Sequence, residues 1–255
     1  MKSFILAGAC LTLAIASCKK SNDSAPNPGS GSTLVRIQQG TDPDITNDTV
    51  YLIKYDASSR IASITDSLNQ DTLVAAYDGV TGKLATVKST WGDNASFVYD
   101  GSGQLLQVNY ILAGSSERDA FEYSNGVVSK KSYYSNLGSG SLSLQGYSTY
   151  VVTNGNITSM SDYTKGGTLK STTTYAYNTQ TNSFKDLSLF NNGNALGTDN
   201  IINRETYFNK NLLASASLSG AISSNTYSFN GSTMTKAIAL DASNGEVYTW
   251  MFSYK

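Results

Sequence analysis

The sequence predicts an all-β protein, built as an antiparallel meander of repeated β-hairpins. Three observations lead to this prediction. A short phrase of an aromatic residue, an aspartate and a turn recurs along the chain. The segments between the turns alternate apolar and polar residues and are rich in β-branched and aromatic types. After the first eighteen residues, no segment carries apolar residues at helical spacing.

The repeat is clearest in "YDASSR" (55–60), "YDGVTGK" (77–83) and "YDGSGQ" (99–104), which begin 22 residues apart. Weaker copies begin at Tyr123, Val152, Tyr177, Phe208 and Phe229, and the series ends at Tyr254. A period in the twenties with turn residues at a fixed phase indicates one supersecondary unit used many times. Two strands per unit predict roughly 16 to 18 strands, which would curl into a barrel, a sandwich or a long twisted sheet.

The position after the aromatic residue indicates a folding role for the aspartates. The strict copies place Asp56, Asp78 and Asp100 there, and the later copies place Ser, Thr or Asn. These four residue types hydrogen-bond their own backbone to start a turn, whereas a catalytic carboxylate would lose its function if replaced by an amide or a hydroxyl. We therefore expect turns here and not a reaction centre.

The first eighteen residues have the layout of a secretory signal peptide. Lys2 precedes an apolar stretch over residues 4–15 that is too short to span a membrane, and "IASC" ends at Cys18. This stretch resembles a bacterial lipoprotein signal, whose cysteine is acylated, for example with palmitate, and becomes the new N-terminus. Lys19 stands where an aspartate would favour retention in the inner membrane. The resemblance therefore implies a lipid anchor in the outer membrane, on either its periplasmic or its surface side.

The expected organisation has three parts. Residues 1–17 would form the signal peptide, and residues 18–33 would form the lipidated cysteine and a polar Pro/Gly/Ser tether. Residues 34–255 would form a single β-repeat domain.

The composition excludes several classes of function. The chain has no histidine, which removes serine–histidine triads and histidine-ligated metal sites. Cleavage before Cys18 would remove Cys10, so the one remaining cysteine would carry the lipid and no thiol nucleophile would be left. Lys and Arg total 18 against 19 Asp and Glu, so no nucleic-acid partner is expected.

The phrase "YDGSGQLLQV" (99–108) resembles the YD repeats of Rhs-type proteins. A secreted lipoprotein built from this phrase is similar to Bacteroidetes lipoproteins with a domain of unknown function, some of them described as porin-like in fold. The resemblance covers most of residues 50–255 and is strict in the first three copies. Rhs arrays form a shell around a toxin cargo, and because no cargo domain is recognisable in this sequence, we do not transfer that function.

Aromatic side chains indicate a possible binding surface. The final strand, "EVYTWMFSY", would place Tyr248, Trp250 and Tyr254 on one face, where planar rings could stack on a glycan or a peptide. Long connections over residues 135–146 and 191–203 are a second expected place for binding. We therefore expect a non-catalytic binding or scaffold module for a glycan or an envelope protein.

Two alternatives to this function stay open. One is a histidine-free, carboxylate-based glycan hydrolase, which would need a pair of opposed carboxylates. The other is a porin-like barrel in the outer membrane. Most expected strands are shorter than the 9 to 11 residues of a spanning strand. In "STTTYAY" (171–177), Thr172 and Thr174 give the second face a polarity that suits water better than lipid.

Two further kinds of site are expected. An oxygen-rich loop before the first clear repeat could hold Ca²⁺, although it lacks the EF-hand pattern, and no other cofactor is expected. The candidate ligands are Asp42, Asp44 and Asp48. Several Asp-Ser/Thr-apolar tripeptides resemble the acceptor motif of Bacteroidetes O-glycosylation. This resemblance implies modification at Thr49, Ser67 and Thr72.

Overall fold

The computed structural model describes residues 33–41, 49–112, 114–136, 140–190, 204–242 and 244–255. Within these ranges the chain forms sixteen strands and two short 3₁₀ helices. The strands are β1 (Leu34–Thr41), β2 (Thr49–Tyr55), β3 (Ile61–Asp66), β4 (Thr72–Tyr77), β5 (Leu84–Ser89), β6 (Asn94–Tyr99), β7 (Leu105–Leu112), β8 (Ser115–Ser124), β9 (Val127–Ser135), β10 (Ser143–Thr153), β11 (Asn156–Thr164), β12 (Leu169–Thr181), β13 (Asn211–Leu218), β14 (Ala221–Asn230), β15 (Thr233–Leu240) and β16 (Val247–Tyr254). The helices are η1 (Leu187–Phe190) and η2 (Arg204–Phe208), which both lie between β12 and β13.

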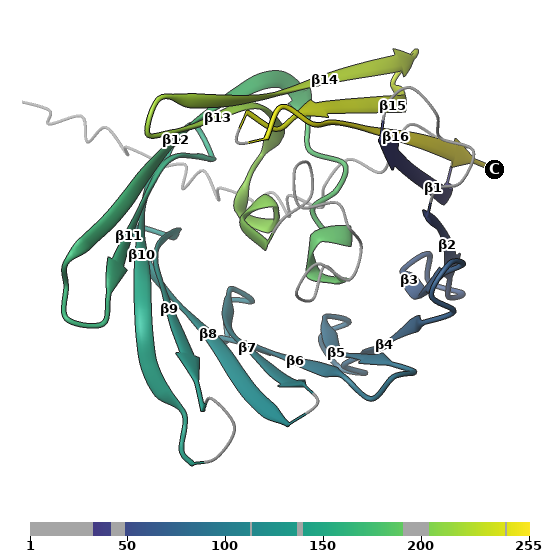
Figure 1. The fold of residues 1–255 in the computed structure, drawn as a ribbon. Helices are drawn as coiled ribbons and strands as arrows, with labels where there is room; N and C mark the ends of the chain where they lie inside the picture. The colour runs from purple at the N-terminus through teal and green to yellow at the C-terminus, as the bar shows by residue number, and fades with distance from the viewer. Residues whose placement is uncertain (1–32, 42–48, 113, 137–139, 191–203, 243) are drawn as a thin grey trace, which may run out of the picture.

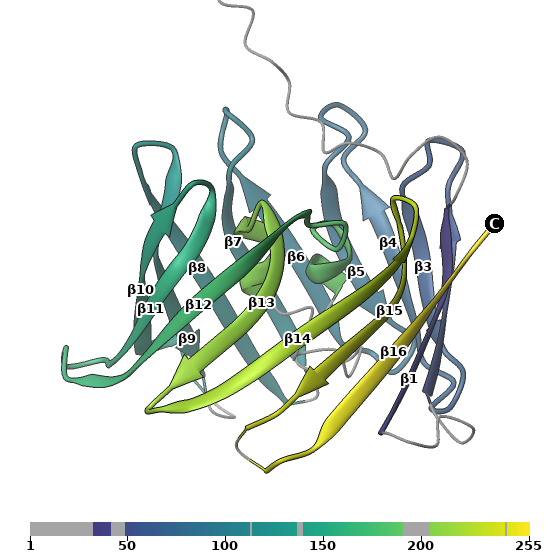
Figure 2. The same ribbon diagram turned by 90° about the horizontal axis from the view of Figure 1, so that it is seen from above.

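The sixteen strands of the described chain close into one antiparallel barrel (Figure 1). Each strand pairs with its neighbours in sequence, and β1 pairs with β16 in a register that runs from Leu34 opposite Tyr254 to Thr41 opposite Tyr248. Figure 2 shows the strands crossing the wall at a slant, as closure of a sheet requires. The predicted all-β meander of roughly 16 to 18 strands is confirmed, and of the three predicted shapes the barrel is the one observed.

The two faces of the barrel wall differ in polarity because side chains alternate along each strand. In β5, Val87 points inward and is buried, whereas the next residue, Lys88, is exposed. In β12, Thr172 and Thr174 are exposed, and Thr173 between them is buried. The buried inner face is mainly apolar, but it also carries polar residues such as Asp119 and Thr173. The outer face combines polar residues such as Lys88 with exposed apolar residues such as Leu52 and Val98.

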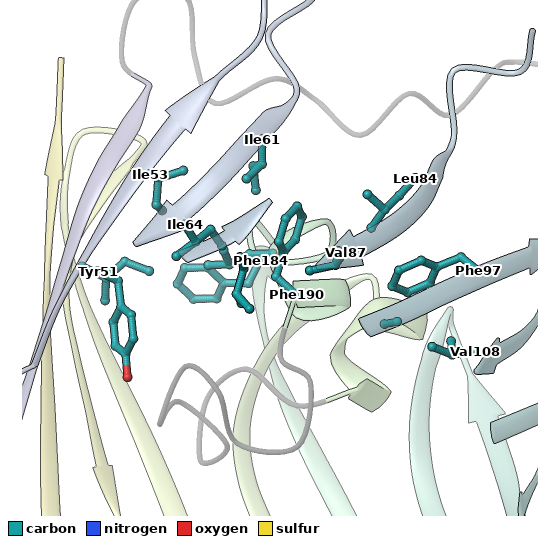
Figure 3. Close-up of a cluster of buried hydrophobic side chains, with 14 of the residues drawn as sticks. Tyr51, Ile53, Ile61, Ile64, Leu84, Val87, Phe97, Val108, Phe184 and Phe190 are labelled. Atoms are coloured by element: carbon teal, nitrogen blue, oxygen red, sulfur yellow. The ribbon is translucent and has the colours of Figure 1, made fainter. Parts of the chain in front are cut away.

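The described parts of the connection between β12 and β13 lie inside the barrel, where Figure 1 shows the helices η1 and η2 within the ring of strands. We call its described parts, residues 182–190 and 204–210, the internal segment. Phe184 and Phe190 are each only 1% exposed and lie among inward side chains of the wall (Figure 3). The Phe184 ring centroid is 5.3 Å from that of Phe252 in β16. A sixteen-strand wall encloses more space than its own side chains can fill, so the internal segment completes the core.

Buried asparagines hold the internal segment in place. The Asn182 side-chain amide donates to the carbonyls of Thr206 at 2.8 Å and Asn209 at 3.0 Å. The Asn209 side-chain oxygen accepts from the backbone N–H of Ile157 in β11 at 2.8 Å. These contacts satisfy buried polar groups and join both ends of the segment to each other and to the wall.

The repeated aspartates start turns, as predicted. One oxygen of Asp56 accepts from the backbone N–H groups of Ser58 and Arg60 at 2.8 and 3.0 Å. Asp78 accepts from the N–H of Thr81 at 2.6 Å, and Asp100 accepts from that of Gln104 at 2.9 Å. Hydrogen bonds from backbone and side-chain donors lower the pKa of all three carboxyl groups.

Two copies of the repeated phrase do not make the expected turns. β12 continues through Tyr177 to Thr181, and Phe208 ends η2 inside the barrel. The prediction of a hairpin turn at these two positions was wrong, because the chain leaves the meander there to fill the barrel. The two 3₁₀ helices were not predicted, and none of the described helices is long and apolar enough to cross a membrane.

The turn role of Asp78 predicts how the domain responds to substitution at this exposed position. Asp78→Asn should leave the midpoint of chemical denaturation nearly unchanged, because an amide oxygen still accepts the turn's N–H groups. Asp78→Val should lower the midpoint, because it removes that acceptor. Equal losses from both substitutions would contradict the turn role and point to a need for the charge itself.

Candidate functional site

The repeated aromatic residues gather at one end of the barrel. Strands β2, β4, β6, β8 and β16 all end there, because hairpins reverse the chain at every step. Each of these strands has an aromatic residue at its last or next-to-last position, and these aromatic side chains point inward and pack against the core. We call this set the tyrosine collar; it consists of Tyr55, Tyr77, Tyr99, Tyr123 and Tyr254.

Some collar hydroxyls bind the preceding repeat, and others do not. Tyr77 donates to the carbonyl of Ile61 at 2.8 Å, and Tyr123 donates to that of Leu105 at 2.7 Å. Among the described residues, none forms a hydrogen bond with the hydroxyl of Tyr55, Tyr99 or Tyr254. The collar therefore contains both structural hydroxyls and hydroxyls that are available to a ligand.

Basic side chains from the turns lie over the collar rings. The Arg60 guanidinium is 4.1 Å from the Tyr77 ring centroid, and the Lys83 ammonium is 5.1 Å from that of Tyr99. Arg60 also forms an ion pair with Asp56 at 2.7 Å, so its charge is balanced within the turn. These cation–π contacts join each turn to the ring of the next repeat and fix the ring orientation.

Four of the five collar tyrosines, all except Tyr123, line a cavity of about 530 Å³, which we call the mouth cavity. Asp186 and Tyr207 of the internal segment also line this cavity. Phe184, Leu187 and Phe190 contribute buried apolar side chains to the lining, and we call these three side chains the apolar floor. This volume lies within the roughly 300–1,000 Å³ of cavities that hold small ligands.

The cavity tyrosines stay protonated far above neutral pH. Burial, and after it the negative charge of Asp186, raises the pKa of Tyr55, Tyr77 and Tyr207 to about 12. Burial likewise raises the pKa of Tyr254 to about 12. At neutral pH each hydroxyl can thus both donate and accept a hydrogen bond. Among the described residues that line the cavity, Asp186 is the one carboxylate.

A second, smaller cavity of about 260 Å³ lies beside strands β8 to β12. Its lining is polar and includes Asp119, which is 1% exposed, and Asp162, which accepts from Ser148 at 2.5 Å. The Lys131 ammonium, also in the lining, contacts Glu205 of η2 at 2.5 Å. The sequence offered no reason to pair Lys131 with Glu205, because 74 residues separate them.

The three aromatic residues predicted to bind a ligand share an inward face but lie in different surroundings. Tyr254 lines the mouth cavity. Trp250 is 0% exposed and packs in the core, where Tyr248 stacks on it with ring centroids 6.1 Å apart. The Tyr248 hydroxyl donates to Glu246. Only Tyr254 of the three reaches the cavity, whereas Tyr55, Tyr77, Tyr99 and Tyr207, which the sequence analysis did not single out as ligand residues, reach it as well.

The other expected sites are placed only in part. Cys18 and the candidate calcium ligands Asp42, Asp44 and Asp48 lie outside the described residues. Ser67 is exposed in the turn between β3 and β4. Thr49 and Thr72 begin β2 and β4 and are half-buried. The predicted long connection over 191–203 is also outside the described residues, and β10 begins at Ser143, so the other connection is shorter than expected.

Comparison with known proteins identifies the fold. No family model and no curated protein matches the chain. A porin-like protein from Bacteroides uniformis has a similar structure, with a TM-score of 0.56, 11% sequence identity, and coverage of 88% of this chain and 99% of that one. A porin-like protein from Bacteroides vulgatus gives a TM-score of 0.59 at 10% identity with the same coverages.

At this level of identity the two similarities show the fold alone. They favour the porin-like barrel, which the sequence analysis kept as an alternative, over the more general binding or scaffold module as a description of the architecture. The chain therefore has a porin-like barrel fold, and its activity stays a matter for proposal.

The raised pKa values predict a loss of stability at alkaline pH. Unfolded tyrosines lose their protons near pH 10, whereas Tyr55, Tyr77 and Tyr207 keep theirs to about pH 12 when folded. Between these values the folded state binds more protons, so its stability is complete below about pH 10 and falls as pH rises toward 12. Urea denaturation at a series of pH values should show this fall, and Tyr55→Phe should make it shallower. A midpoint that stays level from pH 9 to 12 would contradict the assignment.

Proposed function

We propose that this chain is a porin-like barrel of the cell envelope that binds a ligand at its tyrosine-lined mouth and does not conduct solutes through its lumen. The observation that carries the proposal is the mouth cavity, which is lined by four collar tyrosines and by the buried side chains of Phe184, Leu187 and Phe190. A cavity with an apolar floor and convergent hydroxyl groups is the usual form of a small-molecule binding site.

The polarity of the wall supports a barrel that stands in water. Membrane-spanning barrels have an apolar outer face and a polar lumen. Here the buried interior of the described barrel is mainly apolar, and outward positions include Lys54, Lys88 and Thr174. Strands β2 to β6 have 6 or 7 residues, fewer than the 9 to 11 that cross a bilayer.

An attachment to the outer membrane through acylated Cys18 completes this proposal. Its support is the lipoprotein-like signal that ends in "IASC". A lipid anchor would hold the barrel in water at the membrane surface, without requiring its strands to cross the bilayer.

A solute-conducting barrel is the second candidate. It is favoured by the closed sixteen-strand wall and by the similarity to solved proteins titled porin-like. Exposed apolar residues on the outer face, such as Leu52, Val74 and Val98, also fit this candidate better than a fully polar surface would.

Electrical recording separates the two candidates. The purified protein should produce no conductance steps when it is added to a planar lipid bilayer, because the internal segment lies within the lumen and packs against the wall. A general porin in the same bilayer serves as the positive control. Stable, repeated conductance steps from this chain would overturn the proposal and establish the second candidate.

A further inference from the structure

The mouth cavity has features that select the chemical class of its ligand, and this inference rests on the function proposed above. Tyr55, Tyr99 and Tyr254 line the cavity, and their hydroxyls form no hydrogen bond with another described residue. Each can donate and accept, so the cavity matches a ligand whose own groups do both. A purely hydrocarbon ligand would cover these hydroxyls and leave their hydrogen bonds unmade, which is unfavourable.

The apolar part of the cavity lining favours a ligand that has apolar surface as well as hydroxyl groups. Its floor is made by Phe184, Leu187 and Phe190, and tyrosine rings stand above the floor. The C–H faces of a sugar ring are apolar while its rim carries hydroxyls, so such a ring can lie against this floor and reach the phenols at once.

The charges around the cavity favour a neutral ligand. Arg60 is neutralised by its ion pair with Asp56. The remaining charged side chains in the described lining are Lys83 and Asp186, one of each sign. Burying a charged ligand here would remove its hydration without a matching excess of opposite charge.

We propose that the mouth cavity binds the end of a neutral oligosaccharide, with sugar rings against the aromatic floor and sugar hydroxyls bonded to Tyr55, Tyr99 and Tyr254. The volume of about 530 Å³ accommodates a ligand end and not a long chain, so the rest of the glycan extends from the mouth into solvent.

The test is calorimetric titration of the purified protein with neutral gluco-, manno- and xylo-oligosaccharides of two to six units. Oligogalacturonate serves as the anionic probe and laurate as the apolar probe. At least one neutral oligosaccharide should bind, and the two other probes should bind weakly or not at all. Failure of every neutral oligosaccharide in the panel would overturn the proposal.

Two matched variants locate the site. Tyr99→Phe keeps the ring and removes a free hydroxyl, so it should weaken binding about tenfold without lowering stability. Tyr123→Phe removes a hydroxyl already bonded to Leu105 and lying outside the cavity lining, so it should lower stability and leave binding unchanged. Equal binding by wild type and Tyr99→Phe would overturn the assignment of the site.

The outcomes also separate this proposal from the one on which it rests. If laurate or oligogalacturonate binds and Tyr99→Phe weakens that binding, the mouth is a binding site and the neutral-glycan class is wrong. If none of the probes binds and the protein conducts ions across a bilayer, both proposals are wrong.

Discussion

The filling of the barrel by its own chain is the interaction on which the rest of this structure depends. Sixteen strands make a wall too wide for its own side chains to fill the interior, and an unfilled interior would leave apolar inward side chains without packing partners. Phe184, Leu187 and Phe190 of the internal segment supply the missing contacts. The same three side chains form the floor of the mouth cavity, so packing of the core and shape of the candidate site have one cause.

One repeated sequence motif forms both the exposed turns and the inward-pointing aromatic rings at the collar end of the barrel. Its aspartate bonds the backbone of an exposed turn, while its tyrosine points inward to the core. Neighbouring copies also contact each other at the repeat distance: Arg60 donates to the carbonyl of Gly82 at 3.4 Å, and Gln104 donates to that of Gly126 at 3.0 Å, each across 22 residues. A short local pattern used repeatedly can thus produce a ring of aromatic side chains around one opening, and a ligand site can arise there without any dedicated catalytic motif.

Local patterns allowed the strands, the turns and the sharing of faces to be predicted, because alternation and turn chemistry act between near neighbours. Closure between β1 and β16 was only one of three predicted shapes, since it depends on residues more than 200 positions apart. The internal segment was not predicted, because Phe184 and Phe190 belong to no periodic pattern and are defined only by the wall around them. For the same reason alternation placed Trp250 on the correct face but could not show that it would be completely buried.

The central claim is that the packed core of this protein lies inside the barrel and that the outside of the barrel faces water. A matched pair of charge substitutions tests it most directly: Val87→Asp on the inner face, 1% exposed, and Val98→Asp on the outer face, 43% exposed. In detergent-free buffer, urea denaturation should show that Val98→Asp changes the free energy of unfolding by at most about 0.5 kcal/mol. Val87→Asp should prevent folding or greatly reduce stability. The opposite order, with folding only in detergent and Val98→Asp the more harmful change, would contradict the account and indicate a lipid-facing outer wall.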